Sequence, residues 1–331
     1  MPSRGTDTDA WSLSAVEDRP PVVHVAMATY NGRCWIEAQV RSIFRQRGVQ
    51  IHLVVSDDGS SDGTREWLED LAERDPRVTL LPQRVGEAGV GANFLYALEH
   101  ADAAPADYVA FSDQDDLWKP DKLRRQISLI RDLDVDAVSS NVYAFWQGPN
   151  GEVKKELIRK DGPQVEWDFV FEAPSTGSSF LLTYRAWKLV ADYVAHHGVE
   201  GIWLHDWYIY ALVRAAGMKW FIDPEPLVAY RQHDSNELGA HQGIGANMRR
   251  LRDLLSGRYL EQFIRVHQAS MHVAQESGRD TQWLEDMDHL GALLRDKSWK
   301  ARLAILRRFR KIRRRPSEGL SLALARVVGV W

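Results

Sequence analysis

Cysteine and long hydrophobic runs are scarce in this sequence. The 331 residues contain one cysteine, Cys34, which excludes an intramolecular disulfide and a zinc site built on cysteine ligands. We expect Cys34 to be a buried, inert thiol. No window is long and apolar enough to span a bilayer. Residues 1–20 carry acids and arginine without an apolar core, so we predict a disordered tail there and no signal peptide.

Phosphate-binding loops are also missing. The turn at 29–32 lacks the glycine-rich fingerprint of dinucleotide-binding folds, and no glycine-rich loop ends in a phosphate-binding lysine. These absences exclude a dinucleotide-dependent enzyme of that type and a P-loop nucleotidase. Without an export signal or a membrane span, the sequence predicts a cytoplasmic protein, or one that is attached to a membrane from the cytosolic side.

Charge is unevenly distributed along the chain. The formal net charge is −4, but ten Lys or Arg and no acid lie between Lys297 and Arg315, so the remainder carries −14 by difference. A local basic segment can contact an anionic membrane or nucleic acid, or it can be a solvated helix face.

Apolar runs and helical patterns alternate through the first 134 residues. Strands are predicted at 22–28, 51–56, 78–81 and 108–112, and helices at 35–46, 65–73, 91–100 and 120–131. This alternation predicts an α/β fold of Rossmann-like type. We expect a mostly parallel sheet with right-handed crossovers, flanked by helices.

Polar clusters follow three of these strands, at 29–32, 57–63 and 113–116. Ligands of such sheets bind beyond the carboxyl ends of the strands, so we expect the three clusters to share one site. Asp57 and Asp58 are adjacent and would face opposite sides of a strand, and we assign ligand contact to Asp58.

The third cluster is rich in carboxylates. In extended chain Asp113 and Asp115 point the same way, and Gln114 points oppositely. Two carboxylates this close favour a cation between them, and oxygen ligands suit Mg²⁺ or Mn²⁺ that also holds a diphosphate. We interpret Asp116 as a cap of the helix that Pro120 opens.

Taken in order, these motifs resemble those of glycosyltransferase family 2, the inverting enzymes of GT-A fold. The resemblance covers roughly residues 22–236 and rests on three segments: Thr29-Tyr30-Asn31-Gly32, Asp57-Asp58-Gly59-Ser60, and Asp113-Gln114-Asp115-Asp116 with Trp118-Lys119-Pro120. The sequence of residues 112–118 is similar to that of bacterial rhamnosyltransferase-like members, which build cell-surface polysaccharides.

The resemblance implies which residues bind the donor, a nucleotide diphosphate sugar. The implied nucleotide-sugar contacts are Thr29, Tyr30, Asn31, Asp57, Asp58, Asn93, Asp113, Gln114 and Arg231. The implied ligands of a divalent metal, Mg²⁺ or Mn²⁺, are Asp113, Asp115 and His233. Arg231 and His233 would share one face of an extended segment and suit a departing diphosphate. For Asn93, an ordinary helix-surface amide is an equal alternative.

Asp206 opens a predicted helix that runs to about residue 216. An acid there is commonly a cap, worth about 0.5–2 kcal/mol. The resemblance makes it the general base that takes a proton from the acceptor hydroxyl. The implied acceptor contacts are Trp118, Thr176, Gly177, His205 and Trp207. For Trp207, core packing is the alternative that we favour.

From residue 246 onward the pattern becomes helical. In 298–314, Ala301, Ile305, Phe309 and Ile312 form one face of a predicted helix, and Lys300, Arg307, Lys311 and Arg314 form the opposite face. A peripheral membrane contact through 298–331 and a packed helix with a solvated basic face are both open, and nucleic acid is disfavoured.

These inferences combine into one hypothesis. The chain is divided into a tail (1–20), a GT-A catalytic domain (21–240, with a nucleotide-sugar half to about 134 and an acceptor half from 135) and a helical C-terminal region (241–331). The resemblance implies a metal-dependent inverting glycosyltransferase that uses dTDP-rhamnose, or alternatively a UDP sugar, as donor and a glycan or lipid-linked saccharide as acceptor. The alternatives are a sugar-nucleotide nucleotidyltransferase and a non-catalytic nucleotide-sugar-binding protein.

Overall fold

A computed structural model describes residues 19–86, 88–148, 151–199, 201–233 and 256–331. Nearly all of the predicted tail, the predicted domain boundary at 240/241 and the end of the resemblance at residue 236 lie outside these residues. Across the described part, every helix is too short or too polar to traverse a lipid bilayer.

The first half alternates strands and helices as predicted. In order these are β1 (Val22–Thr29), α1 (Ile36–Phe44), β2 (Gln50–Asp57), α2 (Thr64–Arg74), β3 (Val78–Leu80), α3 (Val90–Glu99) and β4 (Tyr108–Ser112). All four strands are parallel, in the order β3-β2-β1-β4. The carboxyl ends of β1, β2 and β4 therefore meet at one edge, as parallel pairing requires.

The second half extends this sheet with antiparallel pairs and with one parallel pair, β6 with β9. Its elements are β5 (Leu117–Trp118), α4 (Lys122–Leu133), β6 (Ala137–Gln147), β7 (Val153–Ile158), α5 (Asp168–Phe171), the short 3-10 helix η1 (Gly177–Ser179), β8 (Leu181–Thr183), α6 (Tyr184–His197), α7 (His205–Ala215) and β9 (Trp220–Arg231). The sheet continues β4-β8-β6-β9-β5, and β7 pairs with β6 alone. The predicted α/β fold is confirmed. Strand β7 was not predicted, because its polar residues lack a buried face.

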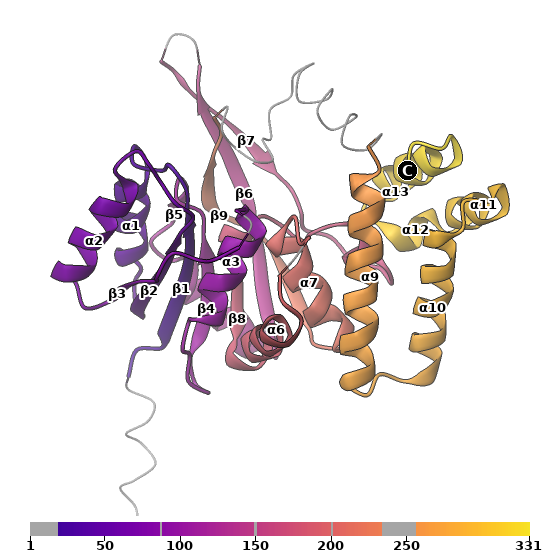
Figure 1. The fold of residues 1–331 in the computed structure, drawn as a ribbon, viewed down its shortest axis with the longest axis horizontal. Coiled ribbons are helices and arrows are strands. Elements are labelled where there is room, and N and C mark those ends of the chain that lie inside the picture. The colour runs from indigo at the N-terminus through magenta and orange to yellow at the C-terminus, as the bar shows by residue number, and fades with distance from the viewer. Residues whose placement is uncertain (1–18, 87, 149–150, 200, 234–255) are drawn as a thin grey trace, which may run out of the picture.

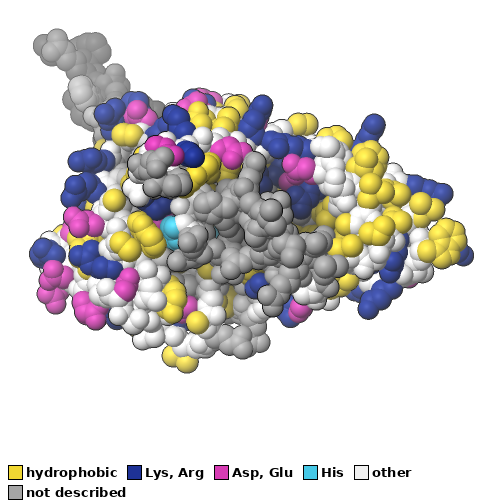
Figure 2. Space-filling view, turned by 90° about the horizontal axis from the view of Figure 1, so that it is seen from above, with side chains coloured by type: hydrophobic (Ala, Val, Ile, Leu, Met, Phe, Trp, Pro, Cys, Tyr) yellow, Lys and Arg dark blue, Asp and Glu magenta, His cyan; other side chains and the backbone are white. Residues whose placement is uncertain are grey.

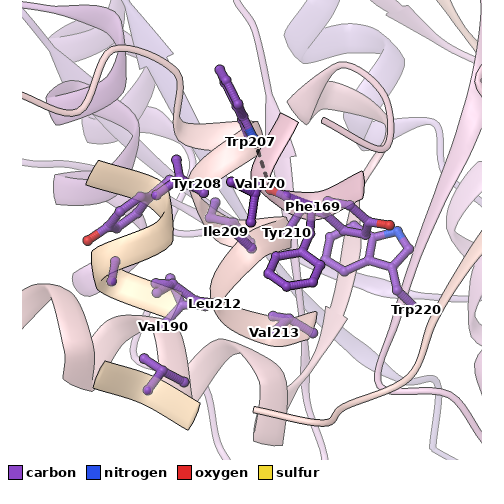
Figure 3. Packing of buried hydrophobic residues seen from close by; sticks show 14 of the residues in the cluster. Phe169, Val170, Val190, Trp207, Tyr208, Ile209, Tyr210, Leu212, Val213 and Trp220 are labelled. Carbon is purple, nitrogen blue, oxygen red and sulfur yellow. Dashed lines mark hydrogen bonds between the residues drawn. The ribbon is translucent and has the colours of Figure 1, made fainter. Parts of the chain in front are cut away.

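Two apolar cores lie on opposite faces of the sheet. One contains apolar side chains of α1, α2 and α4, and the other contains those of α3, α6 and α7. In the second core, α7 packs against the segment around α5, and Trp207 Nε1 donates to Phe169 O at 2.9 Å (Figure 3). This bond joins the start of α7 to the wall of the site described below.

The C-terminal helices gather at one end of the molecule (Figure 1). They are α9 (Arg258–Glu276), α10 (Thr281–Arg295), α11 (Trp299–Arg307), α12 (Phe309–Ile312) and α13 (Pro316–Val327). Apolar residues of α9 and α10 belong to the same core as those of α7. The helical region therefore shares its core with the sheet-bearing part of the chain.

The structure corrects the single basic helix predicted over 298–314. It is interrupted between α11 and α12, and Ala301, Ile305 and Ile312 are buried in the core with Phe171. The apolar face proposed for lipid contact is thus packed inside the protein. Arg314, predicted on the solvated face, is also buried, because it pairs with two carboxylates.

Candidate active site

A cavity of about 1360 Å³ opens at the shared edge of β1, β2 and β4. Its wall includes the turns after these strands, the first turns of α3 and α7, and residues 156–161 at the end of β7. It also includes most of 171–177, Tyr230 and His233 at the end of β9, and Tyr259, 313–315 and Glu318 of the C-terminal region. The three polar clusters expected to share one site all contribute to it.

The turns after β1 and β2 are tied together by backbone N–H groups. Asn31 N donates to Ser60 Oγ at 2.8 Å, and Asn31 Oδ1 accepts from Ser61 N at 2.8 Å. Asn31 adopts a φ of 49°, a left-handed conformation that asparagine tolerates. The amide of Asn31 therefore shapes this wall of the cavity.

Gln114 clamps the turn after β1 from the opposite side. Its side chain accepts from Tyr30 N at 2.9 Å and donates to Tyr30 O at 2.9 Å. A Cβ at position 32 would lie 2.1 Å from Gln114 Oε1, so a larger residue than glycine would displace the Gln114 amide from this position. The Tyr30 ring is left exposed beside the cavity, where a planar base can stack on it.

The side chains of Asp57 and Asp58 lie in different surroundings, as the alternation of faces along a strand predicts. Asp57 is fully buried, accepts from Thr29 Oγ1 at 2.8 Å and Ser60 N at 3.0 Å, and does not line the cavity. Asp58 lines it and accepts from Gly89 N at 2.8 Å, with Arg84 Nη2 at 3.4 Å. Thr29 lines the cavity as well.

Asn93 is not the surface amide of the alternative interpretation. It is buried in α3, donates to Thr29 O at 3.1 Å and accepts from Ser56 Oγ, while its side of the helix faces the cavity. It therefore joins β1, β2 and α3 beside the cavity.

The acidic cluster lies just beyond β4. Asp113, Gln114 and Asp115 all line the cavity, because the strand ends at Ser112 and the alternation of faces ends with it. Burial, and then the charges of Asp115 and Asp206, raise the pKa of Asp113 well above its usual range. The cluster is thus a site where negative charge exceeds what the protein neutralises.

The role predicted for Asp116 is wrong. It does not cap α4, whose N-cap is Asp121. Asp116 is fully buried, accepts from Ser178 Oγ and accepts from Arg231 N at 3.1 Å. It therefore ties η1 and the end of β9 to the acidic cluster.

His233 and Arg231 contact the cluster differently. His233 Nε2 lies 2.7 Å from Asp115 Oδ2, and its ring stacks on Trp35 with centroids 4.1 Å apart. Arg231 Nε donates to Asp115 O at 2.8 Å, its guanidinium lies over Phe145, and it does not line the cavity. Arg231 supports the acidic turn from behind, and His233 faces the cavity.

The residues present fit a divalent cation that is shared with a phosphorylated ligand. Among the described residues no group of three or more His, Cys, Asp or Glu is arranged to hold a metal alone. Asp115 and His233 are in contact, and Asp113 lines the same cavity. A cation on one or two carboxylates commonly takes its other ligands from substrate phosphates and water.

Asp206 lines the cavity from the first turn of α7. It is not the N-cap, which is Leu204; one Asp206 oxygen accepts from Trp207 N at 2.7 Å. Burial raises the pKa of Asp206 to about 6, although hydrogen bonding and Lys160 act in the opposite direction. A carboxylate with such a pKa can accept a proton near neutral pH.

His205 precedes it and is packed on Phe94, with ring centroids 3.7 Å apart. Burial lowers the pKa of His205 to about 3, so the ring is neutral. A Cβ at position 177 would lie 2.2 Å from His205 Nε2, so Gly177 permits this approach. Thr176 and Trp207 also line the cavity, although Trp207 is mostly buried.

The structure also corrects the acceptor contact expected of Trp118 and the burial expected of Cys34. Trp118 is buried in the core, with Lys122 Nζ 3.9 Å from its ring, and does not line the cavity. Cys34 is exposed, so the expectation of a buried thiol is wrong.

Sequence reasoning missed many of the residues that line the cavity, among them Trp35, Lys160, Tyr230, Tyr259 and Arg313. No local pattern marks them, because they come from elements that are distant in sequence. Tyr230 lies among the acids: burial, and then the charges of Asp113, Asp116, Asp115 and Asp206, raise its pKa.

Comparisons with known proteins agree with this geometry. The family model described as "Glycosyl transferase family 2" matches residues 24–185. The dTDP-rhamnosyl transferase RfbG of Shigella flexneri is 35% identical over 228 residues, which are 68% of this chain and 78% of that protein. The UDP-Glc:alpha-D-GlcNAc-diphosphoundecaprenol beta-1,3-glucosyltransferase WfgD of Escherichia coli is 35% identical over 109 residues, which are 33% of this chain and 41% of that protein.

Among solved structures, S. aureus TarS aligns with a TM-score of 0.53 at 14% identity, over 94% of this chain and 54% of that chain. This likeness supports the fold. The resemblance inferred from the motifs is confirmed, because the match to RfbG exceeds 30% identity over most of both chains. The chain belongs to glycosyltransferase family 2 and is a glycosyltransferase.

Proposed function

We propose that this glycosyltransferase transfers a sugar from a nucleotide diphosphate donor to an acceptor hydroxyl with inversion, using Mg²⁺ or Mn²⁺. The observation that carries the proposal is the position of Asp206, with a pKa of about 6, on the same cavity as Asp113 and Asp115. The influence of Asp206 on the pKa of Asp113 indicates that the two carboxylates are close together.

The donor half of the cavity would hold the nucleotide diphosphate. Tyr30 supplies an exposed ring for the base, and Asp58 a carboxylate that can accept the N3–H of uracil or thymine. Asp57, Asn31, Asn93 and Gln114 hold this wall in place through the hydrogen bonds described above.

Asp115 and His233, with Asp113, would hold the metal, which when bound neutralises charge on the departing diphosphate. Arg231 keeps the acidic turn in place through its bond to Asp115 O. The indole of Trp35 fixes the orientation of the His233 ring by stacking on it.

Asp206 would remove the proton of the acceptor hydroxyl as that oxygen attacks the anomeric carbon. The bond from oxygen to that carbon forms while the bond to the diphosphate breaks on the opposite face, so one displacement inverts the configuration. His205, Thr176, Gly177 and Trp207 would contact the acceptor. Taking up a proton near pH 6 suits this role.

The donor class follows from similarity. We propose dTDP-rhamnose as the preferred donor because RfbG is a dTDP-rhamnosyl transferase, and UDP sugars as the alternative because WfgD uses UDP-Glc. The acceptor would be a glycan or a lipid-linked saccharide in cell-surface polysaccharide synthesis. Nucleotidyl transfer and a purely binding role are not retained, because the chain belongs to a glycosyltransferase family.

We also propose a cytoplasmic enzyme that is peripheral on the cytosolic face of the inner membrane. Hydrophobic and basic side chains gather over the C-terminal helices (Figure 2). The exposed apolar residues there, which we name the C-terminal apolar patch, are Trp299, Leu320, Leu324, Val327 and Val328. Exposed Lys300, Arg307, Arg310 and Lys311 lie on the adjoining helices, and a positive rim suits an anionic lipid surface.

Thermal shift with a panel of nucleotide sugars, with and without Mn²⁺ or Mg²⁺, tests the donor proposal, because a bound ligand stabilises in proportion to its affinity. We expect dTDP-rhamnose with metal to give the largest shift and to be turned over. Asp115→Ala should lose the metal-dependent part of the shift and nearly all transfer, whereas Asp132→Ala, at an exposed position on α4, should behave as wild type. Unchanged nucleotide affinity of Asp115→Ala in the presence of metal would contradict the metal assignment.

A further inference from the structure

One stretch of the cavity wall is lined by basic side chains. They come from two distant segments: Arg159 and Lys160 follow β7, and Arg313, Arg314 and Arg315 precede α13. The proposed donor and base assignments use none of these five residues.

Both segments are held rigidly at the cavity. Asn141, buried in β6, accepts from Lys160 N at 2.6 Å and from Asp161 N at 3.0 Å. Arg315 Nη2 donates to Arg159 O at 2.7 Å, which joins the two segments directly. The backbone that carries Lys160 is thus fixed on both sides.

The second segment is anchored by Arg314. This buried side chain pairs with Asp168 at 3.0 Å and with Glu172 at 3.1 Å, and its backbone N donates to Glu172 Oε1 at 2.6 Å. Its neighbours Arg313 and Arg315 are therefore directed to the cavity by a structural anchor.

The acids in this region are already paired. Arg159 lies 3.0 Å from Asp161, and Arg315 lies 3.3 Å from Glu318. Within the described residues the Lys160 ammonium has no hydrogen bond or ion pair. Lys160 is therefore the cation that lacks an acidic partner in this part of the structure.

Arg313 is only loosely engaged. Its Nη1 lies 3.6 Å from Glu318 and 3.9 Å from Glu172, and its buried Nε has no hydrogen-bond partner among the described residues. An unpaired buried donor is unfavourable. Burial, and then the charge of Arg313, lower the pKa of Lys160. An anion between the two cations would accept a hydrogen bond from Arg313 and reduce the repulsion between Arg313 and Lys160.

We propose that Lys160 and Arg313, with Arg315 beside them, bind a phosphate-class anionic group carried by the acceptor. The inference rests on the proposed function, because it gives the acceptor's chemistry to the same cavity. Phosphate oxygens accept several charge-assisted hydrogen bonds at once, which suits an ammonium and a guanidinium that line the same cavity.

The anion would lie near the attacked hydroxyl. Lys160 is close enough to act on the pKa of Asp206, the proposed base. A single acceptor sugar between the two would place its hydroxyl at Asp206 and its phosphate at Lys160. Two kinds of acceptor share this chemistry: a saccharide on a lipid diphosphate, and a polymer with phosphodiester links.

Calorimetric titration with inorganic pyrophosphate in EDTA tests the site without the donor or a metal. Under these conditions the carboxylates of the donor half repel the probe. We expect binding to the wild type and a loss of at least about tenfold in affinity for both Lys160→Gln and Arg313→Gln, of the size of one charged hydrogen bond. Lys154→Gln, an exposed lysine of β7 that does not line the cavity, is the matched control and should bind as wild type.

Two further probes distinguish the sources. Binding of pyrophosphate without binding of dimethyl phosphate favours a diphosphate-linked saccharide, and equal binding of both favours a phosphodiester polymer. Glucuronate binding alone would overturn the phosphate assignment. So would the absence of any binding by the wild type, or equal pyrophosphate affinity of the wild type, Lys160→Gln and Arg313→Gln.

Failure here and failure of the proposed function are distinguishable. Donor binding, measured by the thermal shift with nucleotide sugars and metal, is assigned to other residues of the cavity and should persist in Lys160→Gln. If wild-type protein binds pyrophosphate in EDTA but no nucleotide sugar, the donor proposal fails and the anion site stands. If nucleotide sugars bind and are transferred to neutral glycosides as fast as to their phosphorylated counterparts, the anion site is wrong.

Discussion

At the residue scale, two roles compete for Asp206, that of a general base and that of a helix cap. It lies in the first turn of α7, but Leu204 is the N-cap, and the hydrogen bond from Trp207 N uses only one of its carboxylate oxygens. A capping acid stabilises the helix, whereas a desolvated carboxyl with a raised pKa is held at a cost in its charged form. The two roles therefore predict opposite effects on stability.

Asp206→Asn should lower the rate of transfer by about 10²–10⁴-fold, because an amide cannot accept the proton. The folded-state pKa of about 6 lies above the unfolded value of 3.8, so the folded state binds more protons between these values and stability falls as pH rises through that window. At neutral pH Asp206→Asn should therefore melt at the same or a higher temperature than wild type. A variant that melts at a clearly lower temperature and loses activity in parallel would instead support a capping role for Asp206.

The same pKa predicts the pH profile. The rate at low acceptor concentration should rise with pH through about 6 and then level off, because the base acts in its charged form. This limb should be absent in Asp206→Asn. Donor affinity, measured in parallel by thermal shift, should not follow the limb, since the base faces the acceptor.

At the element scale, the segment between α12 and α13 depends on one buried arginine. Arg314 joins the C-terminal helices to α5 and to the loop after it through Asp168 and Glu172. Asp168 also accepts from Tyr210 Oη at 2.7 Å, so its charge stays partly satisfied without Arg314, while Glu172 loses its nearest cation.

Arg314→Met should destabilise the protein by an amount near the lower end of about 3–5 kcal/mol, the usual effect of removing one partner of a buried ion pair. Denaturant unfolding at neutral pH measures this change. Arg310→Met, on the exposed side of α12, should change stability by less than about 0.5 kcal/mol. Similar effects of the two substitutions would mean that the segment is not anchored by Arg314.

At the scale of the whole molecule, the C-terminal helices present two different faces. One is buried in the core with Phe171 and Phe263, and it includes Ile305. The other carries the C-terminal apolar patch, in which Val328 is 74% and Trp299 is 68% exposed. Lipid contact is therefore expected through the patch and not through the face of Ile305.

The purified protein should sediment with vesicles rich in anionic lipid and poorly with neutral ones. Binding should weaken with salt, as the Debye length shortens from about 10 Å at 0.1 M to about 3 Å at 1 M.

The double substitution Leu324→Ser with Val328→Ser should release the protein from the vesicles without unfolding it. Val153→Ser, at a similarly exposed valine on β7, is the control and should bind as wild type. Ile305→Ser should unfold the protein, because its side chain is fully buried. Vesicle binding that survives loss of the patch would refute this surface.

The fold and the polar turns of the cavity were predictable because their signals are local. A strand of five residues such as β4 is recognisable by its apolar content, and parallel pairing then brings the polar ends of β1, β2 and β4 together. The separation of Asp57 from Asp58 follows from the alternation of faces. The position of Asp206 follows from the helix in whose first turn it lies.

Contacts between distant residues decided the rest. Asp116 binds Arg231 N across 115 positions of sequence, so a local cap was the only role that its neighbours could indicate. β7 has no buried face, and it exists because β6 offers an edge with which to pair. Arg313 and Lys160 line one cavity because Arg314 and Asn141 anchor their segments. The sequence alone determined the sheet and its acids, and tertiary packing decided what closes the other end of the cavity.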